Sequence, residues 1–277
     1  MTIDGRPALP RELLEEWQLT PDGAPRFGRC AIVLPVRTAA GGPAALKVST
    51  PHWEAELEHL ALQHWRGDGA VRLLRADPRR FALLLERLHV EDLGGMWDVE
   101  ACEVVASFYP RLHVPAGPQF VTLSSCVRRW VEGLRELPRD APVPRRLVEQ
   151  AVALGRDFLA DERTDGRLIH TDLHYDNVLA ADREPWLVID PKPLSGDPHY
   201  EVAPLLWNRW AELTDPVGQG VRRGVRARFH ATVDAAGLDE DRARDWVVFR
   251  MVANAMGEPD DADWVTRCVT IAKSVQE

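Results

Sequence analysis

The sequence predicts an α+β protein in two parts, a small β-rich part at residues 1–89 and a larger, mainly helical part at residues 90–277. Short apolar runs separated by turn residues fill the first part, whereas apolar residues recur at helical spacing in the second. Between them, Asp92–Gly95 has the composition of a linker. Because 277 residues suffice for two hydrophobic cores, we expect two lobes.

The first part begins with a predicted β-hairpin, in which two apolar runs flank the turn-like segment Ala39–Pro43. A helix should follow, because apolar residues such as Leu62 and Trp65 recur among acidic ones. Two more strand-like runs are separated by Asp77 and Pro78. The expected order of strand, strand, helix, strand, strand covers residues 31–37, 44–48, 51–67, 71–74 and 81–86.

The second part contains an apolar stripe typical of a helix that ends near Asp165. Leu147, Ala151, Leu154 and Phe158 form this stripe. Beyond Asp190, residues 191–198 should lack regular structure. Further helices are expected at residues 200–213, 220–236 and 242–256.

A second hairpin is predicted at residues 177–190, where two short apolar runs flank the turn formers Asp182–Pro185. If those four residues form the loop, Ala181 pairs with Trp186, and Asn177 lies directly opposite Asp190. Opposed side chains have Cβ atoms about 4.5 to 5.5 Å apart, close enough to share a small cation. Because amide and carboxylate oxygens suit Mg²⁺, the turn predicts a magnesium site.

Phosphoryl transfer is the chemistry that such a site favours, because the enzyme mainly positions the reactants and neutralises charge. Asp172 is the candidate base for the acceptor hydroxyl, and Lys47 is the lysine of the first ninety residues. A lysine in an apolar strand is costly unless it has a partner. Glu54 and Glu58 on the following helix are candidate partners.

A metallohydrolase is a competing interpretation of the same segment. If residues 168–176 formed one extended strand, alternation would place His170, Asp172, His174 and Asp176 on one face. Nitrogen and oxygen ligands of that kind bind zinc or manganese. The all-oxygen pair of Asn177 and Asp190 favours Mg²⁺ instead.

Composition excludes few functions. The net charge is -9 and basic residues are scattered among acids, so we expect no nucleic-acid partner. The cysteines Cys30, Cys102, Cys126 and Cys268 lie far apart, which argues against structural zinc and a disulfide framework. The first residues lack a basic region followed by an apolar run, and no membrane-spanning run occurs, so we expect a cytoplasmic protein.

The spacing H-x-D-x-x-x-x-N from His170 through Asp172 to Asn177, followed by Ile189 and Asp190, resembles the aminoglycoside phosphotransferases. Other segments resemble their streptomycin 6-kinase and hydroxyurea phosphotransferase branch. These segments are Leu34–Arg37, Ala45–Lys47, Gly69–Leu74, Leu83–Arg87 and Ile189–Lys192. The resemblance covers about residues 17–215. It implies a two-lobed protein-kinase-like fold, with a small β-rich N-lobe (residues 1–89) and a larger, mainly helical C-lobe (residues 90–277).

The resemblance also assigns roles to individual residues. Asp172 would be the catalytic aspartate. Lys47 would bind the ATP phosphates and pair with Glu58, with Glu54 as the fallback. The backbone of Glu86 to Leu88 would form the hinge that meets adenine. Asn177 and Asp190 would hold Mg²⁺.

The implied reaction moves the γ-phosphate of ATP to a hydroxyl of a small molecule. A cationic aminoglycoside or aminocyclitol such as streptomycin is the favoured acceptor, with hydroxyurea-type antibiotics in the same branch. Asp190 is followed by Pro191 and Lys192 where protein kinases have Phe-Gly, so no protein substrate is expected. A kinase of an unrelated metabolite and a catalytically silent binding protein remain alternatives, because no G-x-G-x-x-G precedes Lys47.

Three nearby residues have open roles. His170 is expected to brace its loop, and His174 could brace the loop or contact phosphate. Glu201 stands where the related segment usually carries aspartate, and its role is undetermined.

Overall fold

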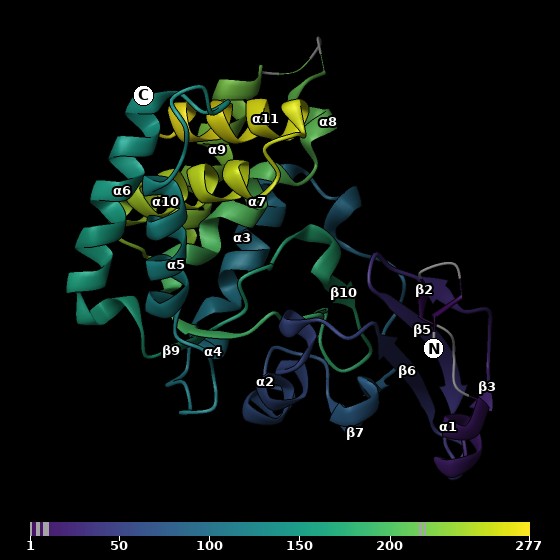
Figure 1. The fold of residues 1–277 in the computed structure, drawn as a ribbon. Helices are drawn as coiled ribbons and strands as arrows, with labels where there is room; N and C mark the ends of the chain where they lie inside the picture. The colour runs from purple at the N-terminus through teal and green to yellow at the C-terminus, as the bar shows by residue number, and fades with distance from the viewer. Residues whose placement is uncertain (1, 4–5, 8–10, 216–217, 219) are drawn as a thin grey trace. The chain divides into compact units, whose positions relative to one another are not determined.

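The computed structural model describes residues 2–3, 6–7, 11–215, 218 and 220–277 (Figure 1). The chain forms two compact units. The first consists of Met1–Asp92 together with Asn177–Pro193, and the second of Leu93–Asp176 together with Leu194–Glu277. The sequence predicted a single division after residue 89. The structure divides the chain after Asp92 and also groups the 177–193 segment with the first unit.

The first unit is built on an antiparallel sheet with the strand order β3-β5-β6-β8-β7, and β4 pairs with the other end of β5. These strands are β3 (Thr20–Pro21), β4 (Arg26–Phe27), β5 (Ala31–Arg37), β6 (Pro43–Ser49), β7 (Leu73–Asp77) and β8 (Ala82–Glu86). A separate two-stranded pair joins β1 (Thr2–Ile3) and β2 (Arg6–Pro7). The predicted order of strand, strand, helix, strand, strand is confirmed.

Element boundaries differ from the prediction in two places. The predicted helix at residues 51–67 is a 3-10 turn, η1 (Trp53–Ala55), followed by the α-helix α2 (Glu58–Trp65). The strand expected at residues 71–74 is β7, which begins at Leu73. Strands β3 and β4 and the first helix were not predicted from the sequence, because these elements are only two to six residues long.

One face of this sheet is covered by α1 (Arg11–Glu16). Leu13 and Trp17 pack in a hydrophobic core with alternate residues of β5 and β6, including Leu34 and Leu46. Successive side chains of a strand point to opposite faces. Lys47, next to Leu46 on β6, therefore faces away from α1.

The second hairpin has a different register from the predicted one. Its strands are β10 (Val178–Ala180) and β11 (Trp186–Val188), and Ala180 pairs with Trp186. The loop therefore has five residues, closed by the N–H of Ala181 donating to the carbonyl of Pro185 at 3.4 Å. The predicted pairing of Ala181 with Trp186, and of Asn177 with Asp190, is wrong by one residue.

The second unit is mainly helical. Its helices are α3 (Asp98–Ser107), α4 (Tyr109–Leu112), α5 (Leu123–Arg135), α6 (Arg145–Ala160), α7 (Ala203–Trp207), α8 (Trp210–Leu213), α9 (Val221–Ala236), α10 (Glu240–Gly257) and α11 (Ala262–Ser274). Two short strands, β9 (Arg167–Ile169) and β12 (Leu194–Gly196), pair antiparallel. The single helix expected at residues 200–213 is instead the 3-10 turn η6 (Pro198–Val202) followed by α7 and α8. The 191–198 segment, expected to be irregular, contains β12.

The core of the second unit lies around α10. The rings of Phe158 and Trp246 stack with centroids 3.6 Å apart, and Phe249 meets Phe158 edge-on. Gly155 of α6 allows this packing, because a Cβ there would lie 2.3 Å from a methyl of Val131 and 2.8 Å from Phe249. The predicted stripe of α6 therefore faces the core.

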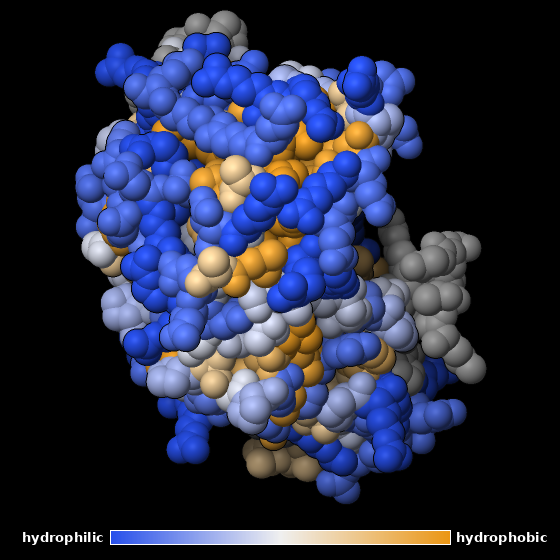
Figure 2. All heavy atoms as spheres, turned by 60° about the vertical axis from the view of Figure 1, so that its left-hand side comes forward, coloured by the Kyte–Doolittle hydropathy of each residue, from blue (hydrophilic) through white to orange (hydrophobic). Residues whose placement is uncertain are grey.

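On the face drawn in Figure 2, hydrophilic side chains predominate, and hydrophobic groups show in patches between them. No helix in the described part of the chain combines the length and apolar composition needed to cross a bilayer.

Candidate active site

Lys47 and Glu58 form a buried ion pair in the first unit. The Nζ of Lys47 lies 2.7 Å from both carboxylate oxygens of Glu58. The Lys47 side chain is 8% exposed and that of Glu58 is 4% exposed. Strand β6 turns the lysine away from the core under α1, and α2 begins at Glu58. The structure thus pairs Lys47 with Glu58, the expected partner.

Asp190 is the second carboxylate on Lys47. The Lys47 ammonium also donates to Asp190 Oδ1, and the Asp190 side chain is 44% exposed. Burial alone would lower the pKa of Lys47, but the carboxylates of Asp190 and Glu58 outweigh it and raise that pKa. The lysine therefore stays protonated at neutral pH, and its two acids come from segments more than a hundred residues apart.

The backbone of Asp190 explains how its side chain leaves the hairpin. Strand β11 ends at Val188, and Asp190 has a φ of 57°, in the left-handed region that non-glycine residues seldom adopt. Strand alternation therefore no longer fixes the direction of its side chain. The one-residue change in register therefore does not by itself separate the side chains of Asn177 and Asp190.

Asn177 closes the 3-10 turn η5 (Tyr175–Asn177), just before β10. It is buried, and its carbonyl accepts the N–H of Ile189 at 2.9 Å, so its backbone is joined to the residue before Asp190. Asn177 and Asp190 offer hard oxygen ligands, and Mg²⁺ commonly takes one or two protein oxygens with phosphate and water completing its shell. The donor chemistry of this pair fits Mg²⁺.

The loop that carries Asp172 is held by a buried carboxylate and a buried guanidinium of the second unit. Glu201 accepts the N–H groups of His170 and Thr171, the latter at 3.0 Å. Arg250 donates to the carbonyl of Thr171 and to that of Tyr200, the latter at 2.9 Å. Thr171 has a φ of 63°, and these bonds hold that uncommon conformation directly before Asp172.

Glu201, whose role the sequence left open, thus serves as an anchor of this loop. Burial alone would raise the pKa of Glu201, but the His113 side chain, the charge of His170 and the N–H of Thr171 outweigh it and lower that pKa. The carboxylate therefore stays ionised. Its Oε2 atom is buried and has no hydrogen-bond partner among the described residues.

Both histidines of this segment bond to backbone N–H groups two residues later. His170 is fully buried, and its Nδ1 accepts the N–H of Asp172 at 3.3 Å. The Nδ1 of His174 accepts the N–H of Asp176 at 3.4 Å, and its Nε2 lies 4.0 Å from the Asp172 carboxylate. The strand β9 ends at Ile169, so the extended strand that the metallohydrolase interpretation requires does not form.

The side chains of the predicted hinge bond to other segments of the first unit. The Glu86 carboxylate accepts the N–H of Arg72 at 2.7 Å and binds the guanidinium of Arg183. Arg87 donates to the carbonyls of Ala44 and Val36, each at 2.8 Å. The side chains of Glu86 and Arg87 are thus occupied by structural bonds, and the sequence expectation for Glu86 to Leu88 concerns their backbone. That role stays a prediction.

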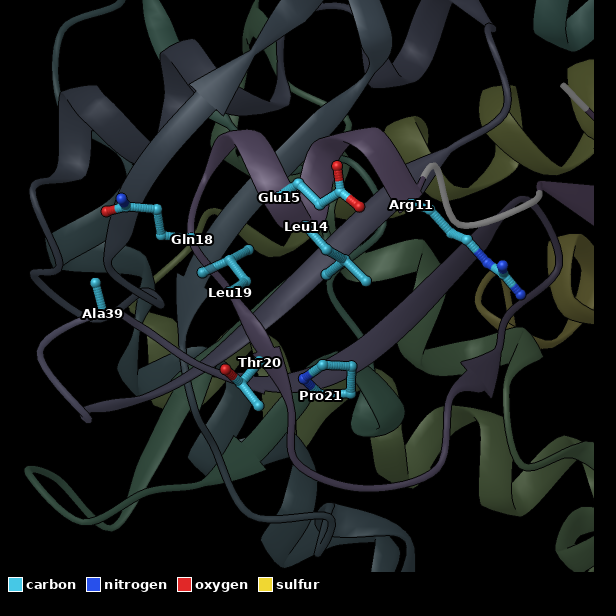
Figure 3. Close-up of a pocket in the computed structure, with 8 residues that line it drawn as sticks. All are labelled: Arg11, Leu14, Glu15, Gln18, Leu19, Thr20, Pro21 and Ala39. Carbon is cyan, nitrogen blue, oxygen red and sulfur yellow. The ribbon is translucent and has the colours of Figure 1, made fainter.

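A hollow of about 640 Å³ lies elsewhere on the first unit (Figure 3). Side chains of α1, β3 and neighbouring turns line it, including Leu14, Thr20 and Ala39. None of the candidate site residues belongs to it, and Lys47 faces the other side of the sheet from α1. We therefore assign the chemistry to the Lys47 cluster rather than to this hollow.

Arg183 and Arg250 were not among the residues predicted from the sequence, and Glu201 had no predicted role. Arg250 carried a signal, because it is a cation inside the otherwise apolar run Trp246–Val252. Buried arginines usually have several acceptors. The sequence around Arg183 gave no such signal, because charged residues in turns are usually solvated.

Comparison with known proteins identifies relatives over nearly the whole chain. Residues 16–261 match the family model for aminoglycoside/hydroxyurea antibiotic resistance kinases. A streptomycin 6-kinase from Streptomyces glaucescens is 38% identical over 284 residues, covering 99% of this chain and 90% of that protein. A hydroxyurea phosphotransferase from Kitasatospora aureofaciens is 40% identical, covering 94% of this chain and 75% of that protein.

The fold has relatives among solved structures. The crystal structure of an aminoglycoside phosphotransferase from Alicyclobacillus acidocaldarius matches with a TM-score of 0.56 at 13% identity, covering 98% of this chain and 94% of that chain. The two-lobed protein-kinase-like fold expected from the sequence is confirmed.

Proposed function

We propose that this chain, which belongs to the aminoglycoside/hydroxyurea antibiotic resistance kinase family, transfers the γ-phosphate of ATP to a hydroxyl of streptomycin. Membership of this family makes the chain a phosphotransferase, and kinases of this family use ATP. The similarity to streptomycin 6-kinases over 99% of the chain supports an aminocyclitol acceptor. Hydroxyurea is the second candidate acceptor, supported by 40% identity to a hydroxyurea phosphotransferase.

The observation that carries the proposal is the buried ion pair of Lys47 and Glu58 together with the partly exposed Asp190. An ion-paired lysine beside a partly exposed carboxylate suits a triphosphate, whose non-transferred phosphates need a fixed cation. Glu58 would hold the lysine in place. Asn177 and Asp190 would hold Mg²⁺, which when bound neutralises charge on the phosphates.

Asp172 would act on the acceptor. Its carboxylate would orient the acceptor hydroxyl and take the hydroxyl proton as the new O–P bond forms. The bond between the γ-phosphorus and the bridging oxygen breaks, and ADP leaves with that oxygen. Glu201 and Arg250 would keep the Asp172 loop fixed during the transfer.

A direct test is ADP release with streptomycin, hydroxyurea and an aminoglycoside without the streptidine ring, each followed by mass measurement of the acceptor. We expect a phosphorylated streptomycin. Phosphorylated hydroxyurea alone would select the second acceptor, and no ADP release with any acceptor would refute the proposal in favour of a silent binding protein or another metabolite kinase.

The role of Asp172 needs a matched control. Asp172→Asn should lower kcat by about two to four orders of magnitude, the range of general base catalysis, and leave ATP binding intact. Asp176→Asn removes the same charge from an exposed residue of the same loop. It should retain most of the activity. Equal losses in both variants would remove Asp172 from its proposed role.

A further inference from the structure

The turn of the second hairpin is fastened to the predicted hinge by Arg183. The Nε and Nη2 atoms of Arg183 bind the Glu86 carboxylate at 2.8 to 3.1 Å. Nη2 also donates to the carbonyl of Ala70 at 2.6 Å, and Nη1 to Glu184 at 2.7 Å. The side chains of Arg183 and Glu86 are only 20% and 19% exposed. One guanidinium therefore joins the hairpin turn to two other segments of the first unit.

Backbone bonds continue the same connection along one edge of the hairpin. Val71 donates its N–H to the carbonyl of Val188 at 2.8 Å, and Val188 donates to the carbonyl of Gly69 at 3.0 Å. The Glu86 carboxylate also accepts the N–H of Arg72. Glu86, the 69–72 segment and β11 thus form one connected network. Asp190 lies two residues after Val188.

The other edge of the hairpin is bound to the segment that follows the hinge. His89 donates its N–H to the carbonyl of Ala180, and Ala180 donates to the carbonyl of Glu91, each at 2.9 Å. The His89 ring also lies 2.8 Å from the Asp182 carboxylate. Both strands of the hairpin are therefore held to the first unit, which explains why the 177–193 segment belongs to it.

We infer that Arg183 is a positioning residue that fixes the metal-holding hairpin relative to the adenine hinge. This inference rests on the proposed function. Adenine at the hinge and Mg²⁺ at Asn177 and Asp190 would bind opposite ends of one nucleotide, so the distance between these two places must match the ligand. The guanidinium of Arg183 sets that distance by binding the carboxylate of Glu86.

The geometry requires arginine. A guanidinium is a planar fork that can bind a carboxylate with two parallel N–H groups and still reach a third acceptor. A lysine at this position would supply one point charge and could not hold Glu86 and the Ala70 carbonyl in the same way. Removal of the fork would also leave the half-buried Glu86 carboxylate without its cation.

The test compares nucleotide affinity with and without Mg²⁺ in Arg183→Gln and Arg183→Lys. Arg145→Gln is the matched control, because Arg145 also pairs with a glutamate, Glu149 at 3.1 Å, on the exposed surface of α6. Loss of a group that orients metal ligands typically weakens the metal site about 10-fold to 100-fold. We expect Arg183→Gln to lower the Mg²⁺-dependent affinity for ATP by about tenfold, with a smaller loss in Arg183→Lys.

The affinity for ATP in the presence of a chelator should change by less than about threefold in all three variants, because this affinity does not depend on the metal ligands. Equal losses of ATP affinity with and without Mg²⁺ would overturn the inference and show that Arg183 stabilises the fold in general. Mg²⁺-dependent binding that is the same in Arg183→Gln as in Arg145→Gln would also overturn it. Absence of Mg²⁺-dependent ATP binding in the wild type would instead refute the proposed function.

Hydrogen exchange gives a readout that needs no nucleotide. The N–H groups of Val71 and Val188 close the connection between the hairpin and the 69–72 segment. They should exchange faster in Arg183→Gln than in the wild type, while the N–H groups in the β5–β6 pair keep their rates. Unchanged exchange at Val71 and Val188 would show that the fork does not fasten the hairpin, and would overturn the inference.

Discussion

Replacing Glu201 by glutamine tests whether this buried carboxylate positions the catalytic loop. Glutamine keeps the size of the side chain and one oxygen that can accept hydrogen bonds, but it removes the charge. In the wild type that charge strengthens two bonds, from the N–H groups of His170 and Thr171. Hydrogen bonds to charged groups contribute about 1.5–3 kcal/mol and neutral ones about 0.5–1.5 kcal/mol. The two weakened bonds should therefore cost about 2 to 3 kcal/mol of unfolding free energy.

The expected effect on catalysis follows from the position of Asp172, one residue after Thr171. A looser Thr171 would let Asp172 leave its working position, and a displacement of about 1 Å can cost about 100-fold in rate. We expect kcat to fall about 10-fold to 100-fold, whereas KM for ATP should change by less than about threefold, because Lys47 is untouched. Urea unfolding and steady-state ADP release, both on the folded variant, provide the two measurements.

Asp197→Asn is the matched control, since Asp197 is another buried acid four residues earlier. Asp197 accepts hydrogen bonds from His199 and from Trp246, the latter at 2.7 Å, and pairs with Arg242, but none of these groups belongs to the Asp172 loop. Its loss should reduce stability without a selective loss of kcat. Equal falls of kcat in the two variants, or a Glu201→Gln enzyme with wild-type kcat, would refute the positioning role.

Three further predictions follow from the same structure. Lys47→Gln should weaken ATP binding and lower kcat/KM by about 100-fold or more. Glu54→Gln, in the 3-10 turn before α2, should change neither. Nucleotide titration of both variants measures this, and equal affinities in the two would show that Lys47 is wrongly assigned. Asp190→Asn should weaken the Mg²⁺-dependent part of ATP binding about tenfold or more, and a normal Mg²⁺ titration would exclude Asp190 as a ligand. Burial would raise the pKa of Asp197, but hydrogen bonds and charges from His199 and Arg242 outweigh it and lower that pKa. The pKa of Glu201 is lowered in the same way by His113 and by the loop. Both carboxylates therefore stabilise the fold above their ordinary pKa of about 4. The urea midpoint should therefore fall as the pH is lowered from about 6 to about 3, less steeply in Asp197→Asn than in the wild type, and equal slopes would contradict the assignment.

Much of the fold was predictable because its signals are local. Apolar runs and turn residues placed β5, β6 and β8, and helical spacing placed α6, α9 and α10. A lysine in an apolar strand needs a partner, so the residues alone offered both Glu54 and Glu58 as partners of Lys47. The family resemblance favoured Glu58, and the structure joins Glu58 to Lys47. The spacing from His170 to Asn177, together with Ile189, Asp190 and the upstream Lys47, indicated the family that the comparisons show.

Hairpin register could not be obtained from the sequence, because a four-residue and a five-residue loop fit the same turn formers. In the structure Ala180 pairs with Trp186, and Val188 of the same strand also bonds to Gly69 and Val71, which lie far away in the chain. A slip of one residue reverses the faces of a strand, so local turn chemistry is not enough to place a metal ligand.

The sequence by itself singled out the residues that we propose to carry the chemistry, whereas the tertiary structure decided what holds them. Glu201 and Arg250 reach the Asp172 loop from helical segments that follow it by about thirty and eighty residues. Arg183 meets Glu86 across 97 positions. Such pairs have no local spacing that distinguishes them from solvated charges. They form only when folding brings a desolvated donor to a desolvated acceptor, and that proximity is a property of the packed chain.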